Sequence, residues 1–325
     1  KCLTIDPNGH IGGGPMYYIE KGLGRQYRPL AIFFAVAGTI CACFGSGTFT
    51  QVNAIVEITN AGAQIPVLYT SIALTVLVAV ITLGGLKSIA VVADKIVPFM
   101  AALYVITTMG ILFMFRDALP GAIAMVLHDA FTGTAATGGF LGATMMFAMR
   151  NGIARGLFSN EAGMGSVPNA AATATTDHPV TQGLIQALGV FVDTLLVCTA
   201  SAFIVMLSKD YMGVGLSGIE LVQYALVEHI GAWSSIFLAV MIFLFAFSSI
   251  IGNYYYGEIN IAFMWQSKKA LNIFRIFVVL MVMFGSVAKV SLVWNLADLF
   301  MALMAITNLI AISRLAPNAY LALKD

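Results

Sequence analysis

Long apolar runs separated by short polar segments dominate the chain from residue 30 onward. A helix needs about 20 mostly apolar residues to cross the roughly 30 Å hydrocarbon core of a bilayer. Two charged, weaker stretches, 86–97 and 118–131, are predicted to lie as amphipathic helices on the membrane surface. Eight stretches are predicted membrane spans: 30–56, 66–83, 98–115, 134–149, 183–207, 233–256, 271–288 and 293–312.

The composition agrees with a lipid environment and with an all-α membrane protein. Of the 325 residues 60% are hydrophobic and only 10% are charged, whereas an ordinary soluble domain carries charge at about a quarter of its positions. The 16 Lys and Arg nearly balance the 15 Asp and Glu. We therefore expect no nucleic-acid partner, because such a partner requires a basic face.

The basic residues fall unequally on the two sides of the predicted bundle. If the eight spans alternate, twelve Lys and Arg lie on one side, three (Arg116, Lys209 and Lys289) lie on the other, and Lys1 completes the total of 16. The richer side is cytoplasmic by the positive-inside rule, so the chain enters its first span from the cytoplasm. Because the sequence starts at Lys1 without a start methionine, we interpret it as an internal fragment. The part before it then holds an even number of spans, if its own terminus is also cytoplasmic.

Polar residues and helix breakers at membrane depth mark candidate sites. In the first span Gln51 and Asn53 place amides in a low dielectric, where they bind either a ligand or a neighbouring helix. The fourth span contains Gly138, Gly139 and Gly142, each of which lowers helix stability by about 1 kcal/mol relative to Ala. This span is therefore predicted either to unwind at membrane depth and expose backbone groups to a ligand, or to pack closely as a helix.

The sixth span contains the adjacent hydroxyls of Ser248 and Ser249. They either bond back to carbonyls of their own helix or offer oxygen ligands to a hard cation such as sodium. Asp193 and Asp298 lie within or at the edge of apolar runs, where an ionised carboxylate is costly unless it is paired. Each is a candidate functional acid, and a structural partner such as a neighbouring Asn or Tyr is the alternative.

A long predicted cytoplasmic segment follows the fourth span and contains RGLFSNEAGMGS at residues 155–166. We expect Glu161 to form an ion pair with Arg150 or Arg155, which acts as a gate or braces the loop. No phosphate-loop lysine follows these glycines, and the chain has no His-Glu-x-x-His. We therefore predict that the protein is not an enzyme and assign no catalytic residue.

Three stretches resemble the sodium-coupled alanine/glycine symporters of bacteria and archaea: GGPMYYIEKGL at 13–23, RGLFSNEAGMGS at 155–166 and NYYYGE at 253–258. The later VWNLAD at 293–298 is similar to the family's closing helices. The resemblance implies a leucine-transporter-type fold of the APC superfamily, with two inverted repeats of five helices. Residues 1–325 would then form a single transmembrane domain containing helices three to ten, in a prokaryotic inner or plasma membrane. Helices one and two would be missing, in agreement with the even number expected from the charges.

The resemblance also implies a site midway across the membrane, between broken helices one and six and closed by helices three and eight. Gating or structural roles are assigned to Arg150, Arg155, Asn160, Glu161 and Glu258. The sodium ligands would be Ser248 and Ser249. The substrate would contact Gln51, Gly142, Met145, Met146, Ser249, Ile250 and Asn253, although some family members have tryptophan in place of Asn253.

The implied function is symport of alanine or glycine into the cell by alternating access, with Na+ as the coupling ion. The bilayer and the missing N-terminal helices of the same protein are the expected partners, and without those helices the chain alone should not transport. The alternatives are a transporter that is coupled to protons or carries another solute, and an amino-acid receptor that does not transport.

Overall fold

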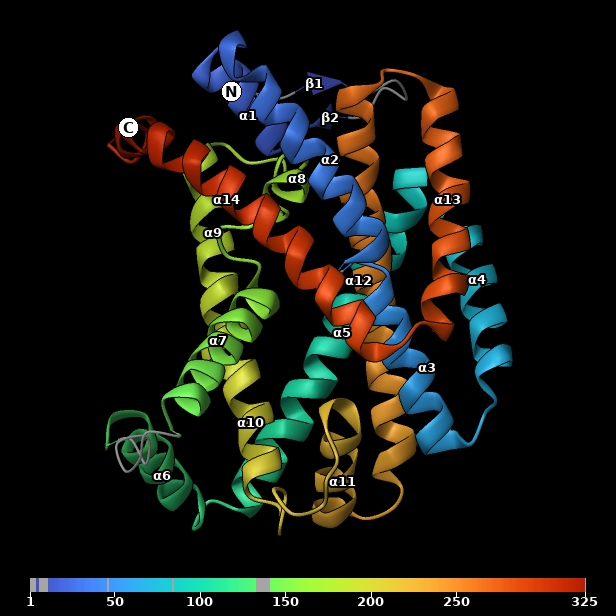
Figure 1. The fold of residues 1–325 in the computed structure, drawn as a ribbon, viewed down its shortest axis with the longest axis vertical. Helices are drawn as coiled ribbons and strands as arrows, with labels where there is room; N and C mark the ends of the chain where they lie inside the picture. The colour runs from blue at the N-terminus through green and yellow to red at the C-terminus, as the bar shows by residue number, and fades with distance from the viewer. Residues whose placement is uncertain (1–3, 6–10, 46, 84, 133–140, 325) are drawn as a thin grey trace.

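The computed structural model describes residues 4–5, 11–45, 47–83, 85–132 and 141–324. Within these ranges the regular structure consists of helices joined by turns and loops, together with the strands β1 (Thr4–Ile5) and β2 (Ile11–Gly12), which pair antiparallel. The helices are α1 (Pro15–Leu23), η1 (Arg25–Tyr27), α2 (Arg28–Phe44), α3 (Phe49–Ala63), α4 (Val67–Leu83), α5 (Gly85–Met114), α6 (Leu119–Thr132), α7 (Leu141–Asn160), α8 (Val167–Ala171), α9 (Pro179–Phe191), the π-helical η3 (Val192–Cys198), α10 (Thr199–Met206), α11 (Gly218–Ile230), α12 (Ser234–Met264), α13 (Lys268–Val287) and α14 (Val290–Ala322) (Figure 1).

Six described helical stretches are long and apolar enough to cross a membrane: Arg25–Ala63, Val91–Met114, Pro179–Met206, Ser234–Met264, Lys268–Val287 and Leu292–Ala322. Val67–Thr82 is a shorter apolar helix that corresponds to the predicted span 66–83. Residues 134–140 of the predicted span 134–149 lie outside the described residues, and its described part belongs to α7, which runs from Leu141 to Asn160 and is not among the six. Because α7 includes Arg150 and Arg155, it is less apolar than the other long helices.

The first predicted span is interrupted. The sequence pattern predicts one helix over 30–56, whereas α2 ends at Phe44 and α3 begins at Phe49. The Thr48 hydroxyl donates a hydrogen bond to the Ala42 carbonyl oxygen at 2.7 Å, which satisfies a backbone acceptor that the break leaves free. Gly45 and Gly47 lie within this interruption, and glycine tolerates backbone conformations that other residues avoid.

Two further helices differ from the pattern. Gly142 lies in the first turn of α7, where the backbone is regularly helical, so the predicted unwinding does not occur at this residue; Gly138 and Gly139 lie outside the described residues. The predicted surface helix 86–97 is continuous with the span 98–115 in the 30-residue helix α5. The helix continues through Pro98 at this junction.

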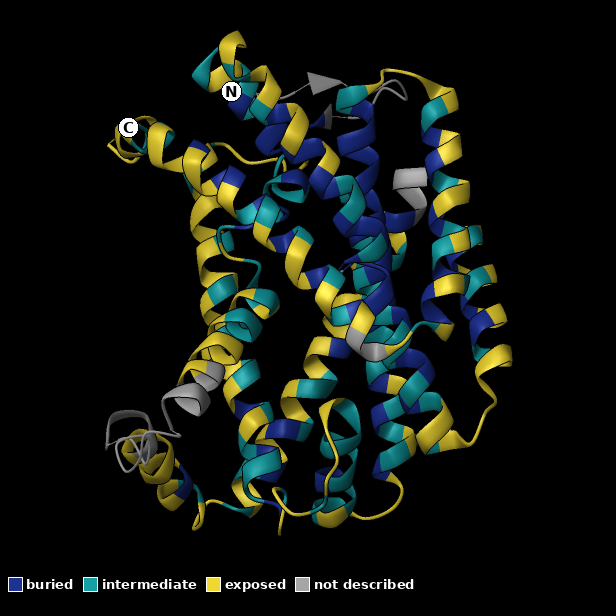
Figure 2. Cartoon of the chain, viewed as in Figure 1, coloured by how far each residue is buried: buried dark blue, intermediate teal, exposed yellow. Residues whose placement is uncertain are grey.

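The long helix α12 lies at the centre of the bundle, in contact with α2, α3, α5 and α13. Buried residues concentrate along α2, α3 and α12, while α9, α13 and α14 expose many of their residues (Figure 2). Those outward faces are apolar, as Leu188, Ile276 and Leu309 illustrate. An apolar exterior around a buried centre is what an integral membrane protein requires.

The loops lie in two groups, one at each end of the helix bundle. The α12–α13 connection, α1 and the C-terminus lie at one end, and the α10–α11 and α11–α12 connections lie at the other (Figure 1). The first end therefore collects residues that the sequence places on the cytoplasmic side, including Lys268 and Lys269 at the start of α13.

We expect Gly47→Ala to lower the thermal unfolding midpoint of the detergent-solubilised protein. An added Cβ would lie 2.6 Å from the Ala42 carbonyl oxygen and 2.7 Å from the Asn253 Cβ, so backbone or α12 must shift. Overpacking of this kind costs about 1–3 kcal/mol. In Gly110→Ala, the matched control, the added Cβ meets nothing within 4 Å. Its midpoint should be unchanged or raised, and a Gly47→Ala midpoint equal to that of the parent would contradict the close approach of α12.

Candidate functional site

A cavity of about 400 Å³ lies between α5, the end of α7, the α9–η3 helix and α12. Ile89, Ala93 and Val97 of α5 give it an apolar wall. Its polar wall residues come from three parts of the chain. The end of α7 and the next residue supply Ser159, Asn160 and Glu161, and the α9–η3 helix supplies Gln186 and Asp193. Helix α12 supplies Ser248, Ser249, Asn253 and Tyr256. Segments that are far apart in the sequence thus place hydroxyl, amide and carboxylate groups around one space.

The cavity brings together five of the residues predicted for the site, namely Asn160, Glu161, Ser248, Ser249 and Asn253. Helix α12 supplies the last three; Ser249 and Asn253 are four residues apart and therefore share one face of the helix, and Ser248 adjoins Ser249.

Other predicted residues do not line this cavity. Ile250 is fully buried in the hydrophobic core, and Gln51 is half-buried on α3. Met146 is 67% exposed on α7. Gly142 and Met145 lie near the start of α7; at a rise of about 1.5 Å per residue, Gly142 is about 27 Å along the helix from Asn160. The structure therefore does not unite the start of α7 with Ser249.

The two serines of α12 that line the cavity, Ser248 and Ser249, both bond to their own helix. Ser248 and Ser249 donate hydrogen bonds to the Phe245 carbonyl oxygen at 2.8 and 3.0 Å, and the Asn253 amide donates to the Ser249 carbonyl at 3.0 Å. The first of the two predicted alternatives, hydrogen bonds from the serine hydroxyls to carbonyls of their own helix, is thus present. A hydroxyl that donates one hydrogen bond still keeps lone pairs on its oxygen, so both serines retain the capacity to ligate a cation.

Asp193 lies at the cavity wall within the π-helical segment η3. Its Oδ2 accepts a hydrogen bond from the Ser159 hydroxyl at 2.8 Å, and the Cys198 sulfur lies 3.9 Å away. The partners are therefore a serine and a cysteine rather than the expected Asn or Tyr. Asn160 also joins α7 to η3, since its amide donates to the Thr194 hydroxyl at 2.9 Å. Short π-helical segments are rare and occur frequently at functional sites.

The predicted ion pair of Glu161 with Arg150 or Arg155 is wrong for Arg155. The Arg155 guanidinium pairs with Asp298 and stacks over the Trp294 ring, 4.3 Å from its centroid. Glu161 instead accepts a hydrogen bond from the Ser166 hydroxyl. The left-handed backbone of Glu161, with φ of 53°, turns the chain out of α7 and makes this local contact possible.

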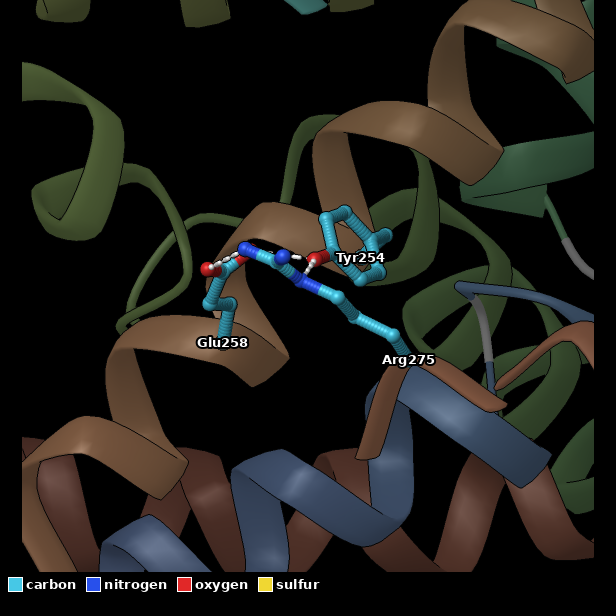
Figure 3. A network of polar contacts seen from close by, with 3 residues as sticks. All are labelled: Tyr254, Glu258 and Arg275. Carbon is cyan, nitrogen blue, oxygen red and sulfur yellow. Dashed lines mark hydrogen bonds and ion pairs between the residues drawn. The ribbon is translucent and has the colours of Figure 1, made fainter. Parts of the chain in front are cut away.

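A second polar network joins α12 to α13 beside the cavity. Figure 3 shows the Arg275 guanidinium reaching both Tyr254 and Glu258, with Arg275 Nη2 2.8 Å from Glu258 Oε1 and Nε 2.9 Å from the Tyr254 hydroxyl. The Tyr254 hydroxyl also donates to Glu258. These contacts hold one face of α12 against α13 while Asn253, the residue before Tyr254, faces the cavity.

Sequence reasoning assigned Glu258 a gating or structural role but missed Arg275. The sequence does contain a feature that could have identified Arg275: it is a lone charge four residues after the start of the apolar run 271–288. A charge at that depth is costly unless it has a partner.

The chain is similar to membrane transporters of one family. The profile of the sodium:alanine symporter family matches residues 3–325. The probable sodium/glutamine symporter GlnT of Bacillus subtilis (strain 168) is 48% identical, over 98% of this chain and 65% of the relative. The amino-acid carrier protein AlsT of the same strain is 46% identical, over 96% of this chain and 65% of the relative. The sodium/alanine symporter AgcS of Methanococcus maripaludis is 36% identical, over 96% of this chain and 68% of the relative. The chain thus spans about two thirds of the length of these relatives.

Breaking the α12–α13 network should destabilise the protein strongly. The side chains of Arg275 and Glu258 are only 16% and 8% exposed, so Arg275→Ala leaves a buried carboxylate without its cation. Loss of one partner of a buried pair costs about 3–5 kcal/mol. The control is Arg28→Ala, whose pair with Glu20 at 3.6 Å is longer and more exposed, at 54% and 26%, and contributes at most about 1 kcal/mol. Thermal unfolding in detergent measures both, and equal midpoints would show that the network does not hold α12.

Glu161 should make stability dependent on pH. Burial raises the pKa of this carboxyl, and the Asp193 carboxylate raises it further, while the Ser166 hydroxyl lowers it. A raised pKa in the folded state means that the folded protein holds its proton more tightly than the unfolded chain does. Stability should therefore decrease as the pH rises from the usual pKa of a glutamate towards the raised value.

The matched variant is Glu161→Gln, which keeps the size of the side chain and cannot ionise. Its unfolding midpoint should exceed that of the parent at pH 8 and approach it at pH 4. The same midpoint difference at both pH values would refute the assignment to Glu161.

Proposed function

The chain belongs to the sodium:alanine symporter family, and from this membership we propose that it forms the greater part of a transporter coupling Na+ entry to uptake of a small neutral amino acid. Members of the family are transporters rather than enzymes, and the apolar helices make this an integral membrane protein. The finer proposal is alanine or glycine as substrate, alternating access as mechanism and the prokaryotic plasma membrane as location.

The cavity is the observation that supports this proposal. An amino acid presents an ammonium and a carboxylate group, and Na+ prefers hard oxygen ligands. Hydroxyl oxygens of Ser248 and Ser249 suit the cation, while Asn253 and Ser249 offer amide and hydroxyl contacts to the substrate. The carboxylates of Asp193 and Glu161 lie on the facing walls, where they suit an ammonium group.

The size of the cavity supports two extensions of the proposal. A volume of about 400 Å³ exceeds what alanine or glycine requires. We therefore propose that helices of the whole protein beyond residues 1–325 complete the site, in a leucine-transporter-type fold where this single domain supplies helices three to ten. A larger substrate such as glutamine is the second candidate, because the 48% identical relative GlnT is named a probable sodium/glutamine symporter.

The test is uptake of labelled alanine and glutamine into proteoliposomes that contain the full-length protein. With an inward sodium gradient Ser249→Ala should reduce uptake about tenfold or more, because loss of one ligand to a charged group costs about 1.5–3 kcal/mol. Ser71→Ala is the matched control: this buried serine also bonds back to a carbonyl four residues earlier, that of Val67, but lies on α4.

Other outcomes separate the alternatives. Equal uptake by Ser249→Ala and Ser71→Ala would remove α12 from the site. Uptake that persists when choline replaces sodium would favour proton coupling through Asp193 or Glu161. Binding of alanine without uptake would indicate a receptor.

A further inference from the structure

We propose that the junction of α12 and α13 binds an anionic phospholipid of the cytoplasmic leaflet, at a site separate from the cavity. A groove of about 390 Å³ lies between α2, α12 and α13. Its apolar lining consists of Ile261, Trp265, Ala270, Ile273, Phe274 and Phe277. The cavity described above uses other residues of α12, all of them before Gly257.

The groove suits a hydrocarbon chain. Ile273 is 68% exposed and Trp265 is 56% exposed, so the groove opens to the medium around the bundle. Among the described lining residues, Thr39 has a hydroxyl that already donates to the Ala35 carbonyl oxygen at 2.8 Å, and the only other polar group is the indole N–H of the exposed Trp265. The surface therefore offers mainly van der Waals contact.

Positive charge lies next to the groove in the chain. Lys268 and Lys269 directly precede the groove residue Ala270, are exposed, and form no ion pair within the described part of the chain. Both lie in the first turn of α13, where the positive end of the helix dipole makes a cation unfavourable. The helix is also uncapped, because the Ser267 side chain makes no capping hydrogen bond. An anion at this position would offset both features.

The combination of groove and lysines selects the ligand. A soluble anion would satisfy the lysines and leave the groove exposed, and a neutral lipid would fill the groove and leave the lysines unpaired. An anionic phospholipid satisfies both, with its phosphate near Lys268 and Lys269 and an acyl chain in the groove. The predicted cytoplasmic position agrees, because basic pockets on that side of membrane helices bind anionic head groups and tryptophan anchors at the interface.

The site also adjoins the α12–α13 network. Phe274 lines the groove and stacks on Tyr254, with ring centroids 5.9 Å apart and an interplanar angle of 19°. Tyr254 in turn contacts Glu258 and Arg275 (Figure 3). A lipid chain packed against Phe274 would therefore support the same helix pair.

Trp265 provides the probe for a test in lipid nanodiscs. The full-length protein carries Trp233→Phe and Trp294→Phe, with any tryptophan outside residues 1–325 also replaced by Phe, so that Trp265 is the fluorophore. Brominated phosphatidylglycerol or brominated phosphatidylcholine is then added at a small fraction of the lipid. We expect half-maximal quenching at an at least fivefold lower fraction of brominated phosphatidylglycerol, because a single basic residue near an anionic surface contributes about fivefold.

The variants separate the parts of the site. Lys268→Gln with Lys269→Gln should abolish the preference for phosphatidylglycerol, whereas Lys289→Gln, at the opposite end of α13, should preserve it. Ala270→Phe fills part of the groove, keeps both lysines and should weaken quenching by phosphatidylglycerol. All variants are accepted only if their thermal midpoints match the parent.

Three results would overturn the proposal. The first is equal quenching by the two lipids in the parent protein. The second is a preference that survives loss of both lysines or disappears equally in Lys289→Gln. The third is relief of quenching by millimolar glycerol phosphate, which would show a site for a soluble anion.

Discussion

The buried contact between Arg275 and Glu258 is the constraint on which the arrangement of the central helix depends. Opposite charges inside an apolar bundle are tolerated only while they remain together, because separating them leaves a costly unpaired charge. Tyr254 adds a third polar group to the same contact. Since Tyr254 and Glu258 are one turn apart on α12, the network fixes the rotation of this helix against α13.

That rotation decides which residues of α12 reach the cavity. With Tyr254 and Glu258 facing α13, the chain presents Ser249 and Asn253 to the space bounded by α5, α7 and η3. The polar groups that the proposed transport function needs are thus oriented by side chains that do not line the cavity. Structural charge and site chemistry occupy different faces of one helix.

Small residues allow the rest of the bundle to close around α12. An added Cβ on Gly38 would lie 2.7 Å from the Asn260 amide nitrogen, and one on Gly257 would lie 2.4 Å from the Phe274 ring. Close approach of helix backbones is a general means of packing in membranes, where lipid competes with side chains for apolar contact. The break between α2 and α3 belongs to the same arrangement, since Gly47 there lies against Asn253.

The sequence by itself determined the helical membrane class, the approximate position of six of the eight predicted spans, and the family. Apolar length is a local property, and the motifs at 13–23, 155–166 and 253–258 are contiguous in the chain. Tertiary structure decided the interruption before α3 and the choice of Asp298 over Glu161 as the partner of Arg155. Arg155 and Asp298 are 143 positions apart, and their meeting depends on the depth and rotation of two helices. Neither quantity is encoded in a local pattern, because both are set by how all the helices pack together.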